Sequence, residues 1–483
     1  MAKRNKRSLA VLPALFVCGM LACTGVPFLV PNPPAEKKNG AAAEQKPSPK
    51  VPPAPVTQTQ VKAPTGDTID FAAAFAPDTS GNWNVSVPET ALPAAPAAAY
   101  RSIIVPGNTV RVALRRNVSR AVVHTGDTVE VRSSSLAAAA RCTGRLLVET
   151  KAAGLVTISV NDGPRHEVAL PCTLSAVHQS DIFDLGEERY RGSLIITGRE
   201  LITFVNYLPV EEYLRGVLPL EMGKRGWVEA EALKAQAVAA RTYAYRHIAD
   251  NRGDQPFDVV RTVADQVYGG ADAETAETDS AVTATAGIVL TWHGALADAY
   301  YHSTCGGATA GVDEAWGKPG RDYLSSRSDL APDGRAYCSI SPSFSWEESW
   351  DAQDLSKILQ ATVHQAVPGG RFDGKLKEIV VGERFGSGRI KSCRLVGSGG
   401  SVECGGDKLR SVLRRKTATG DILRSANFTV VKNGPHTFTL RGAGYGHGVG
   451  MCQMGAIGRA RQGQDFEQIL RAYFTGIELC RVQ

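Results

Sequence analysis

A glycine-rich stretch, GAGYGHGVGMCQMGA at residues 442–456, restricts the conformation of this chain more than any other segment. Glycine occupies every second position from Gly442 to Gly450. If the stretch is extended, its glycines lie on one face and the residues between them, His447 included, lie on the other. A bare glycine face lets another backbone or a polymer approach closely, which suits the wall of a groove. A tight loop with several positive φ angles, in which His447 is an ordinary hydrogen-bonded residue, explains the pattern equally well.

The glycine spacing excludes the common phosphate-binding loops. In G-x-G-x-x-G the final glycine would fall on His447, Val449 or Met451, and no G-x-x-x-x-G-K-[ST] follows. The net charge of +6 includes four positive residues within the first seven positions, so the rest of the chain is nearly balanced. The sequence therefore gives no basic face for nucleic acid, and no nucleic-acid partner is expected.

Residues 1–30 are predicted to be a signal peptide or an N-terminal membrane anchor. A positive segment, MAKRNKR, precedes an apolar run that continues to Val30. The positive charges before this run favour an N-terminus on the inner side of the membrane and the rest of the chain on the outer side. A lipoprotein processed at Cys23 is a weaker alternative, because Met20 and Leu21 fit its cleavage pattern poorly. Residues 31–100 are rich in Pro and Ala and are predicted to be a disordered linker.

Eight cysteines follow the signal segment, and an even number in an exported chain predicts disulfides. Neighbour pairing is the simplest expectation, since short loops close most easily. The eight are Cys142, Cys172, Cys305, Cys338, Cys393, Cys404, Cys452 and Cys480.

The folded part is predicted to be α+β. Residues 101–185 contain short alternating runs typical of strands and form a β-rich accessory region, and residues 186–480 mix helices and strands. A helix is expected at LPVEEYLRGVLPLEM, ended by Pro219. A long helix is expected within residues 228–253, and a hairpin that turns at His293-Gly294.

Glu221 is the best candidate for a catalytic carboxyl group. It lies between the two predicted helices, beside Leu220 and Met222. An apolar setting raises the pKa of a carboxyl group and suits a general acid near neutrality. An exposed carboxylate at a helix end is the alternative. Arg241 is the best candidate to hold an anionic group, unless it faces solvent.

His302 and Cys305 in YYHSTCGG have the H-x-x-C spacing of metal ligands. A zinc site would need more ligands, which Cys338, Cys452 or His447 supply only if the fold brings them together. A disulfide at Cys305 is the simpler interpretation in an exported protein.

Several separate blocks resemble the SpoIID/LytB family, which contains stage II sporulation protein D and amidase enhancers. The blocks LPVEEYLRGVLPLEM, EALKAQAVAARTYAY, DQVYGG, YHSTCGG, EAW and GYGHGVGMCQMGA occur in the family's order within residues 186–480. The resemblance implies an exported peptidoglycan lytic transglycosylase with an open glycan-binding cleft and no cofactor. Its implied partners are glycan strands, stripped of stem peptides, and a cell-wall amidase. Sporulation, division and wall remodelling are all compatible roles.

The resemblance also implies roles for individual residues. Glu221 would protonate the glycosidic oxygen and then take the proton of the sugar hydroxyl that closes an anhydro ring. This chemistry needs one carboxyl group, where glycoside hydrolysis usually uses two. His447 is expected to face Glu221 across the cleft, and Arg241 to meet a muramic acid carboxylate. The implied substrate-binding residues are Gln236, Arg241, Tyr301, His302, Ser303, His447 and Gln453.

The chain departs from the family pattern at Cys452, where a serine is usual, and at Gly223, where a proline is usual. Cys452 either pairs with Cys480 or replaces a hydroxyl that touches substrate. Two other functions remain as hypotheses: a non-catalytic glycan-binding protein or amidase modifier, and a metal-dependent hydrolase around His302 and Cys305.

Overall fold

The computed structural model describes residues 100–483, except 179–181, 187, 252, 254, 418, 419 and 435. The predicted signal or anchor, with Cys23, and nearly all of the predicted linker lie outside the described residues. Within the described part both helices and strands are abundant, which confirms the α+β prediction. No helix in this part is long and apolar enough to span a membrane.

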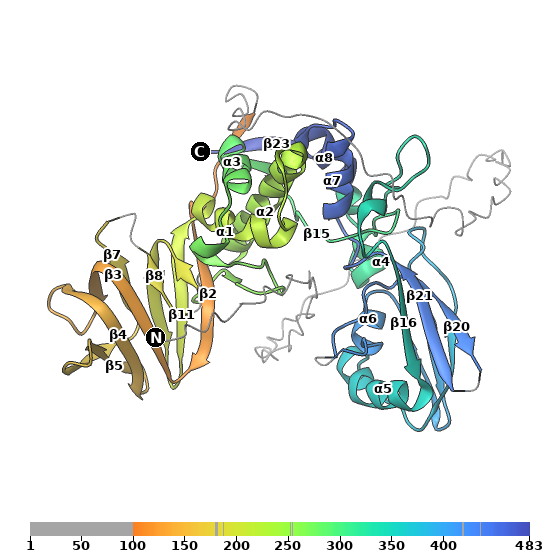
Figure 1. Ribbon diagram of the computed structural model, residues 1–483, viewed down its shortest axis with the longest axis horizontal. Coiled ribbons are helices and arrows are strands. Elements are labelled where there is room, and N and C mark those ends of the chain that lie inside the picture. Colours follow the sequence, from red (N-terminus) through yellow and green to blue (C-terminus); the bar gives the residue numbers. More distant parts are fainter. Residues whose placement is uncertain are drawn as a thin grey trace, which may run out of the picture. The chain divides into compact units, whose positions relative to one another are not determined.

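The N-terminal part of the described chain forms an 11-stranded sheet (Figure 1). Its strands are β2 (Thr109–Val118), β3 (Arg120–Ser133), β4 (Ala140–Ala152), β5 (Leu155–Val160), β6 (Arg165–Ala169), β7 (Cys172–Ala176), β8 (Phe183–Asp184), β9 (Arg189–Tyr190), β10 (Ser193–Gly198), β11 (Ile202–Pro209) and β12 (Val259–Val260). The order is β12-β2-β11-β10-β7-β3-β4-β5-β6, with β8 and β9 attached at β3. Buried and exposed residues alternate along β3, as expected for a strand with one face in the core. The sheet continues beyond residue 185, so the predicted division there stays a prediction.

Helix α1 (Val210–Met222) follows directly from β11. The expectation that Pro219 ends this helix is wrong, because the helix continues through Pro219 to Met222. A proline removes one backbone donor, and the turn beyond it is held by the buried Met222 and by a hydrogen bond from the Gly223 N–H to the Pro219 carbonyl. Glu221 therefore belongs to the helix and not to the following loop.

Helix α2 (Ala230–Asp250) confirms the predicted long helix. Its fully buried alanines, including Ala237 and Ala240, allow neighbouring helices to pack closely. It packs against α1, α3 (Ala276–Ala284), α7 (Gln453–Arg461) and α8 (Phe466–Tyr473).

A four-stranded sheet joins the two ends of the described chain. It contains β1 (Arg101–Ile103), β13 (Ile288–Trp292), β14 (Ala295–Leu296) and β23 (Glu478–Val482), in the order β1-β23-β13-β14. The β13–β14 hairpin turns at His293 and Gly294, as predicted, with φ of 50° and 77°. Two successive positive φ angles are the signature of a type I′ turn.

Residues 345–443 build a part with its own hydrophobic core. Its elements are β16 (Ser345–Asp351), α5 (Ala352–Ala366), β17 (Leu376–Val381), β18 (Cys393–Gly397), β19 (Gly400–Cys404), α6 (Lys408–Val412), β20 (Phe428–Asn433) and β21 (Thr437–Ala443). Strands β16, β21 and β20 lie side by side (Figure 1). Strand β21 leads into the glycine stretch, and β22 (Met451–Cys452) then pairs in parallel with β15 (Tyr301–His302). A short helix, α4 (Val312–Trp316), follows β15.

The predicted disulfides are absent among the described residues, where all eight cysteines are free. Cys142 and Cys172 lie on strands on opposite sides of β3, across from Val129 and Ser133. Cys393 and Cys404 face each other on β18 and β19.

The implied pairing of Cys452 with Cys480 is also absent. Cys480 lies in β23, where its sulfur is 3.2 Å from the Thr291 hydroxyl. Cys452 instead receives the backbone N–H of Cys305 at 3.1 Å.

Candidate functional site

Glu221 lies in the last turn of α1 with its carboxyl group turned into the protein, and it is 8% exposed. Oε1 accepts the backbone N–H of Val267 at 2.9 Å, and Oε2 accepts the Nε2 donor of Gln453 at 3.3 Å. Leu220 and, three residues after Glu221, Lys224 are exposed, so this end of the helix lies at the surface while the Glu221 side chain is largely buried. The alternative of an exposed helix-end carboxylate is therefore excluded.

Burial raises the pKa of Glu221 to about 7, since the charged form loses its hydration. The hydrogen bonds from Val267 and Gln453 act in the opposite direction, because they favour the ionised form, but their effect is smaller. Both protonation states are then populated near neutral pH. This is the property required of a group that first donates and then accepts a proton.

Gln266, for which the sequence predicted no role, links the hydroxyls of Tyr213 and Tyr301. Its fully buried side chain donates to the Tyr301 hydroxyl at 2.9 Å and accepts from the Tyr213 hydroxyl at 3.1 Å. The next residue, Val267, is the one that donates to Glu221. Burial and the nearby Glu221 charge both raise the pKa of Tyr301. The block DQVYGG is recognisable in the sequence, but the contacts of its glutamine depend on the fold and could not be predicted from residue spacing.

His447 is held by backbone groups on both ring nitrogens. The Val449 N–H donates to Nδ1 at 3.0 Å, so Nε2 carries the proton and donates to the Tyr301 carbonyl at 3.0 Å. Burial lowers the pKa of His447 to about 4, which keeps the ring neutral. Its neutral ring thus joins the backbone of Tyr301 to that of Val449, and its expected place opposite Glu221 stays a prediction.

His302 and Ser303 are also buried, at 0% and 6% exposure. His302 donates from Nδ1 to the Val449 carbonyl at 3.2 Å, while Nε2 has no partner among the described residues. Burial lowers the pKa of His302, so this ring is neutral too. The Ser303 hydroxyl pairs with that of Thr304 at 3.2 Å. Contact of either residue with a sugar stays a prediction.

Arg241 does not face a ligand, contrary to expectation. It is fully buried in α2, and its Nε and Nη2 donate hydrogen bonds to the Glu211 carboxylate at 2.8 and 2.7 Å. Its remaining donors go to the carbonyls of Val282 and Ile288 and to the Thr285 hydroxyl. All five N–H groups are occupied within the protein, so none is left for a sugar carboxylate.

Gln236 differs from its neighbours because its amide has no hydrogen-bond partner among the described residues, although it is fully buried. A buried amide usually finds a partner in the protein or in an ordered water. Its expected contact with substrate stays a prediction.

The glycine stretch adopts the loop alternative and not the extended one. Gly444, Gly446, Gly448 and Gly450 all have positive φ, between 72° and 114°. Residues 443–450 are buried, so the stretch does not form the open wall of a groove. The glycines instead admit a neighbouring backbone, because a Cβ at Gly450 would lie 2.1 Å from the Tyr300 carbonyl.

Arg389 supports this loop from the part built by residues 345–443. Its guanidinium occupies the space beside Gly448, where a Cβ would lie 2.3 Å from it. It donates to the carbonyls of Cys305 and Ala308. No local motif marks Arg389 in the sequence, so only the fold reveals this contact.

The candidate metal ligands divide into two groups. Cys305, Cys338 and Cys452 come together with Asp329, all four buried. His302 and His447 do not belong to this group, and their ring centroids lie 5.5 Å apart.

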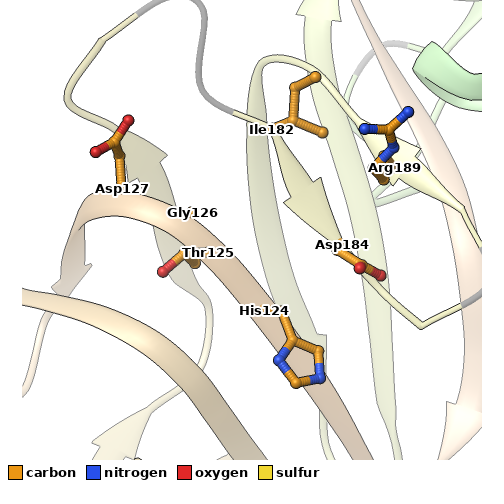
Figure 2. A pocket seen from close by; sticks show the side chains of 7 residues that line it. All are labelled: His124, Thr125, Gly126, Asp127, Ile182, Asp184 and Arg189. Carbon is orange, nitrogen blue, oxygen red and sulfur yellow. The ribbon is translucent and has the colours of Figure 1, made fainter.

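A separate pocket of about 450 Å³ lies on the β-rich sheet and none of the predicted site residues lines it. Figure 2 shows its lining residues on β3, β8 and β9, together with Ile182 just before β8. They are His124, Thr125, Gly126, Asp127, Ile182, Asp184 and Arg189.

Two family models match the chain. A model described as stage II sporulation protein (SpoIID) matches residues 199–292, which include Glu221. A domain of unknown function (DUF8618) matches residues 335–450, which include Arg389 and the glycines up to Gly450.

Known proteins give consistent matches. An uncharacterized protein of Brachyspira hyodysenteriae is 33% identical over 62% of this chain and 74% of its own length. Stage II sporulation protein D of Bacillus amyloliquefaciens is 30% identical over 57% of this chain and 75% of its own length. The amidase enhancer of Bacillus subtilis is 30% identical over 55% of this chain, which spans 40% of that relative.

Proposed function

The chain belongs to the stage II sporulation protein D (SpoIID) family, and from this premise we propose that it is an exported lytic transglycosylase that cleaves peptidoglycan glycan strands. Family membership gives it a function connected with the cell wall. The observation that carries the finer proposal is the buried Glu221 carboxyl group, whose pKa is raised to about 7. A carboxyl group in that state can act as an acid and then as a base in one reaction cycle.

The proposed reaction uses Glu221 twice. Protonated Glu221 donates its proton to the glycosidic oxygen, and the bond from that oxygen to the anomeric carbon breaks. A hydroxyl of the same muramic acid then bonds to the anomeric carbon, and ionised Glu221 takes its proton. No water is consumed and the carboxyl group returns to its starting state. The amides of Val267 and Gln453 stabilise the ionised stage through their hydrogen bonds to the two carboxylate oxygens.

The test is an assay with glycan strands stripped of stem peptides, in which mass spectrometry detects anhydro-muramic ends. We expect product with the native chain and none with Glu221→Gln, since an amide cannot donate the proton. Glu200→Gln is the matched control because Glu200 is exposed. Absence of product from the native chain, where a known transglycosylase is active, would overturn the proposal.

A second candidate is favoured by the amidase enhancer relative: a protein that binds glycan or stimulates a cell-wall amidase without cutting. This function would be selected if Glu221→Gln stimulated a cell-wall amidase as strongly as the native chain and neither protein cleaved glycan. Stimulation that is lost together with cleavage would instead favour the enzyme.

A further inference from the structure

We propose that Cys305, Asp329, Cys338 and Cys452 form a structural zinc site that fixes the loop around β15 to the start of α7. One oxygen of Asp329 and the three sulfurs all lie within 4.8 Å of one another. Every one of the four side chains is fully buried. The ligands come from three segments far apart in the sequence, so no short sequence motif predicts the site.

The spacing matches tetrahedral zinc. With Zn–S bonds of about 2.3 Å, two sulfur ligands of a tetrahedral site are about 3.8 Å apart. The sulfurs of Cys305 and Cys338 are 3.4 Å apart, and the Cys305 sulfur is 3.2 Å from Oδ2 of Asp329. Thiolate sulfur and carboxylate oxygen are both ligands that zinc accepts, and four protein ligands leave no open position for a substrate.

The surroundings of Asp329 hold its carboxylate in the orientation that a zinc ligand needs. Its Oδ1 accepts the Tyr473 hydroxyl at 2.9 Å and Nη2 of Arg459 at 2.9 Å. Oδ2 is left to face the sulfurs. Partners of this kind orient a ligand, and the Arg459 cation offsets part of the negative charge that three thiolates and a carboxylate would carry beyond that of zinc.

The sulfur of Cys452 is surrounded by donors suited to a thiolate. The backbone N–H groups of Cys305 and Gly455 point at it from 3.1 and 3.2 Å. Such N–H groups are the outer partners that a metal-bound thiolate requires. The next residue after Cys452 is Gln453, so the proposed zinc would fix the position from which Gln453 reaches Glu221.

The experiment measures zinc in the full chain, purified without chelator, by elemental analysis. We expect one zinc per chain, release of that zinc by a mercurial that reacts with thiols, and a lower melting temperature after its removal. Co²⁺ exchanged into the site should show thiolate-to-cobalt charge-transfer absorption. Cys452→Ser should lose most of the zinc, whereas Cys142→Ser, a control outside the cluster, should retain it.

Two results would overturn the proposal. One is a disulfide between any two of the three sulfurs, found by mass spectrometry of the unreduced native chain. The other is three free thiols with no zinc bound after incubation with excess Zn²⁺. Neither result depends on glycan cleavage, so the zinc site and the proposed function are tested separately.

Discussion

Gln453 donates its side-chain amide to Glu221 across 232 residues of sequence, with 3.3 Å between Nε2 and Oε2. The contact joins the first residue of α7 to the last turn of α1. The setting of the candidate catalytic group is therefore completed by a residue from the far end of the described chain.

Loss of this contact should raise the pKa of Glu221 further. The amide of Gln453 favours the ionised carboxylate, so Gln453→Met removes a stabilising donor and leaves the burial in place. NMR titration of the Glu221 carboxyl carbon should show a higher midpoint in the variant, and any glycan cleavage should persist to higher pH. Gln462→Met, at an exposed position, should leave the midpoint unchanged.

The stability of the protein should carry the signature of a buried acid. The folded-state pKa of Glu221 lies above its ordinary value of 4.5, so folding favours the protonated form and stability falls as pH rises from 4.5 to about 7. The ionised group then costs about 3 kcal/mol. Urea unfolding at pH 5 and pH 8 should show that the stability of Glu221→Gln relative to the native chain is greater at the higher pH. An equal difference at both pH values would contradict this.

Gly450→Ala should destabilise the fold by about 4 kcal/mol, the sum of a positive-φ penalty and a steric clash. The clash is with the Tyr300 carbonyl, 2.1 Å from the added Cβ. Gly463 is a suitable control, because its φ is +81° and nothing lies within 4 Å of an added Cβ. Gly463→Ala should cost about 1 kcal/mol, so similar unfolding free energies for the two variants would show that the backbone approach is not tight.

Arg241→Met should destabilise the protein by about 1–3 kcal/mol, because it removes the donors to Glu211 and to the buried carbonyls of Val282 and Ile288. Arg246→Met is the control: that arginine is partly exposed and its ion pairs are worth about 1 kcal/mol or less. Chemical denaturation measures both. If Arg241 contacted glycan instead, its replacement would weaken glycan binding and leave the unfolding free energy nearly unchanged.

The sequence predicted those structural elements that depend on interactions between residues near one another in the chain. The long helix α2 follows from its alanine-rich periodicity, and the hairpin at His293-Gly294 follows from a turn that needs two positive φ angles. Glu221 was a candidate because of its apolar neighbours between two predicted helices, and the resemblance of its sequence block implied its catalytic role. Its burial was expected from the apolar neighbours, and the structure bears that expectation out.

What the sequence did not reveal depends on contacts between distant residues. A helix face shows that Arg241 has neighbours but not that Glu211, 30 residues earlier, is its partner. The end of a helix at a proline is a local tendency, which the packing of Met222 overrides. The four clustered ligands span residues 305 to 452, and no periodicity connects them.

Strand β23 lies between β1 and β13, so the last described strand holds the first one in place. During synthesis the ribosome releases residues 101–103 long before residues 480–482, with which they pair. This sheet therefore cannot close on a growing chain, and neither can the contact between Gln453 and Glu221. A partly synthesised chain therefore lacks both the four-stranded sheet and the hydrogen bond from Gln453 that favours the ionised form of Glu221.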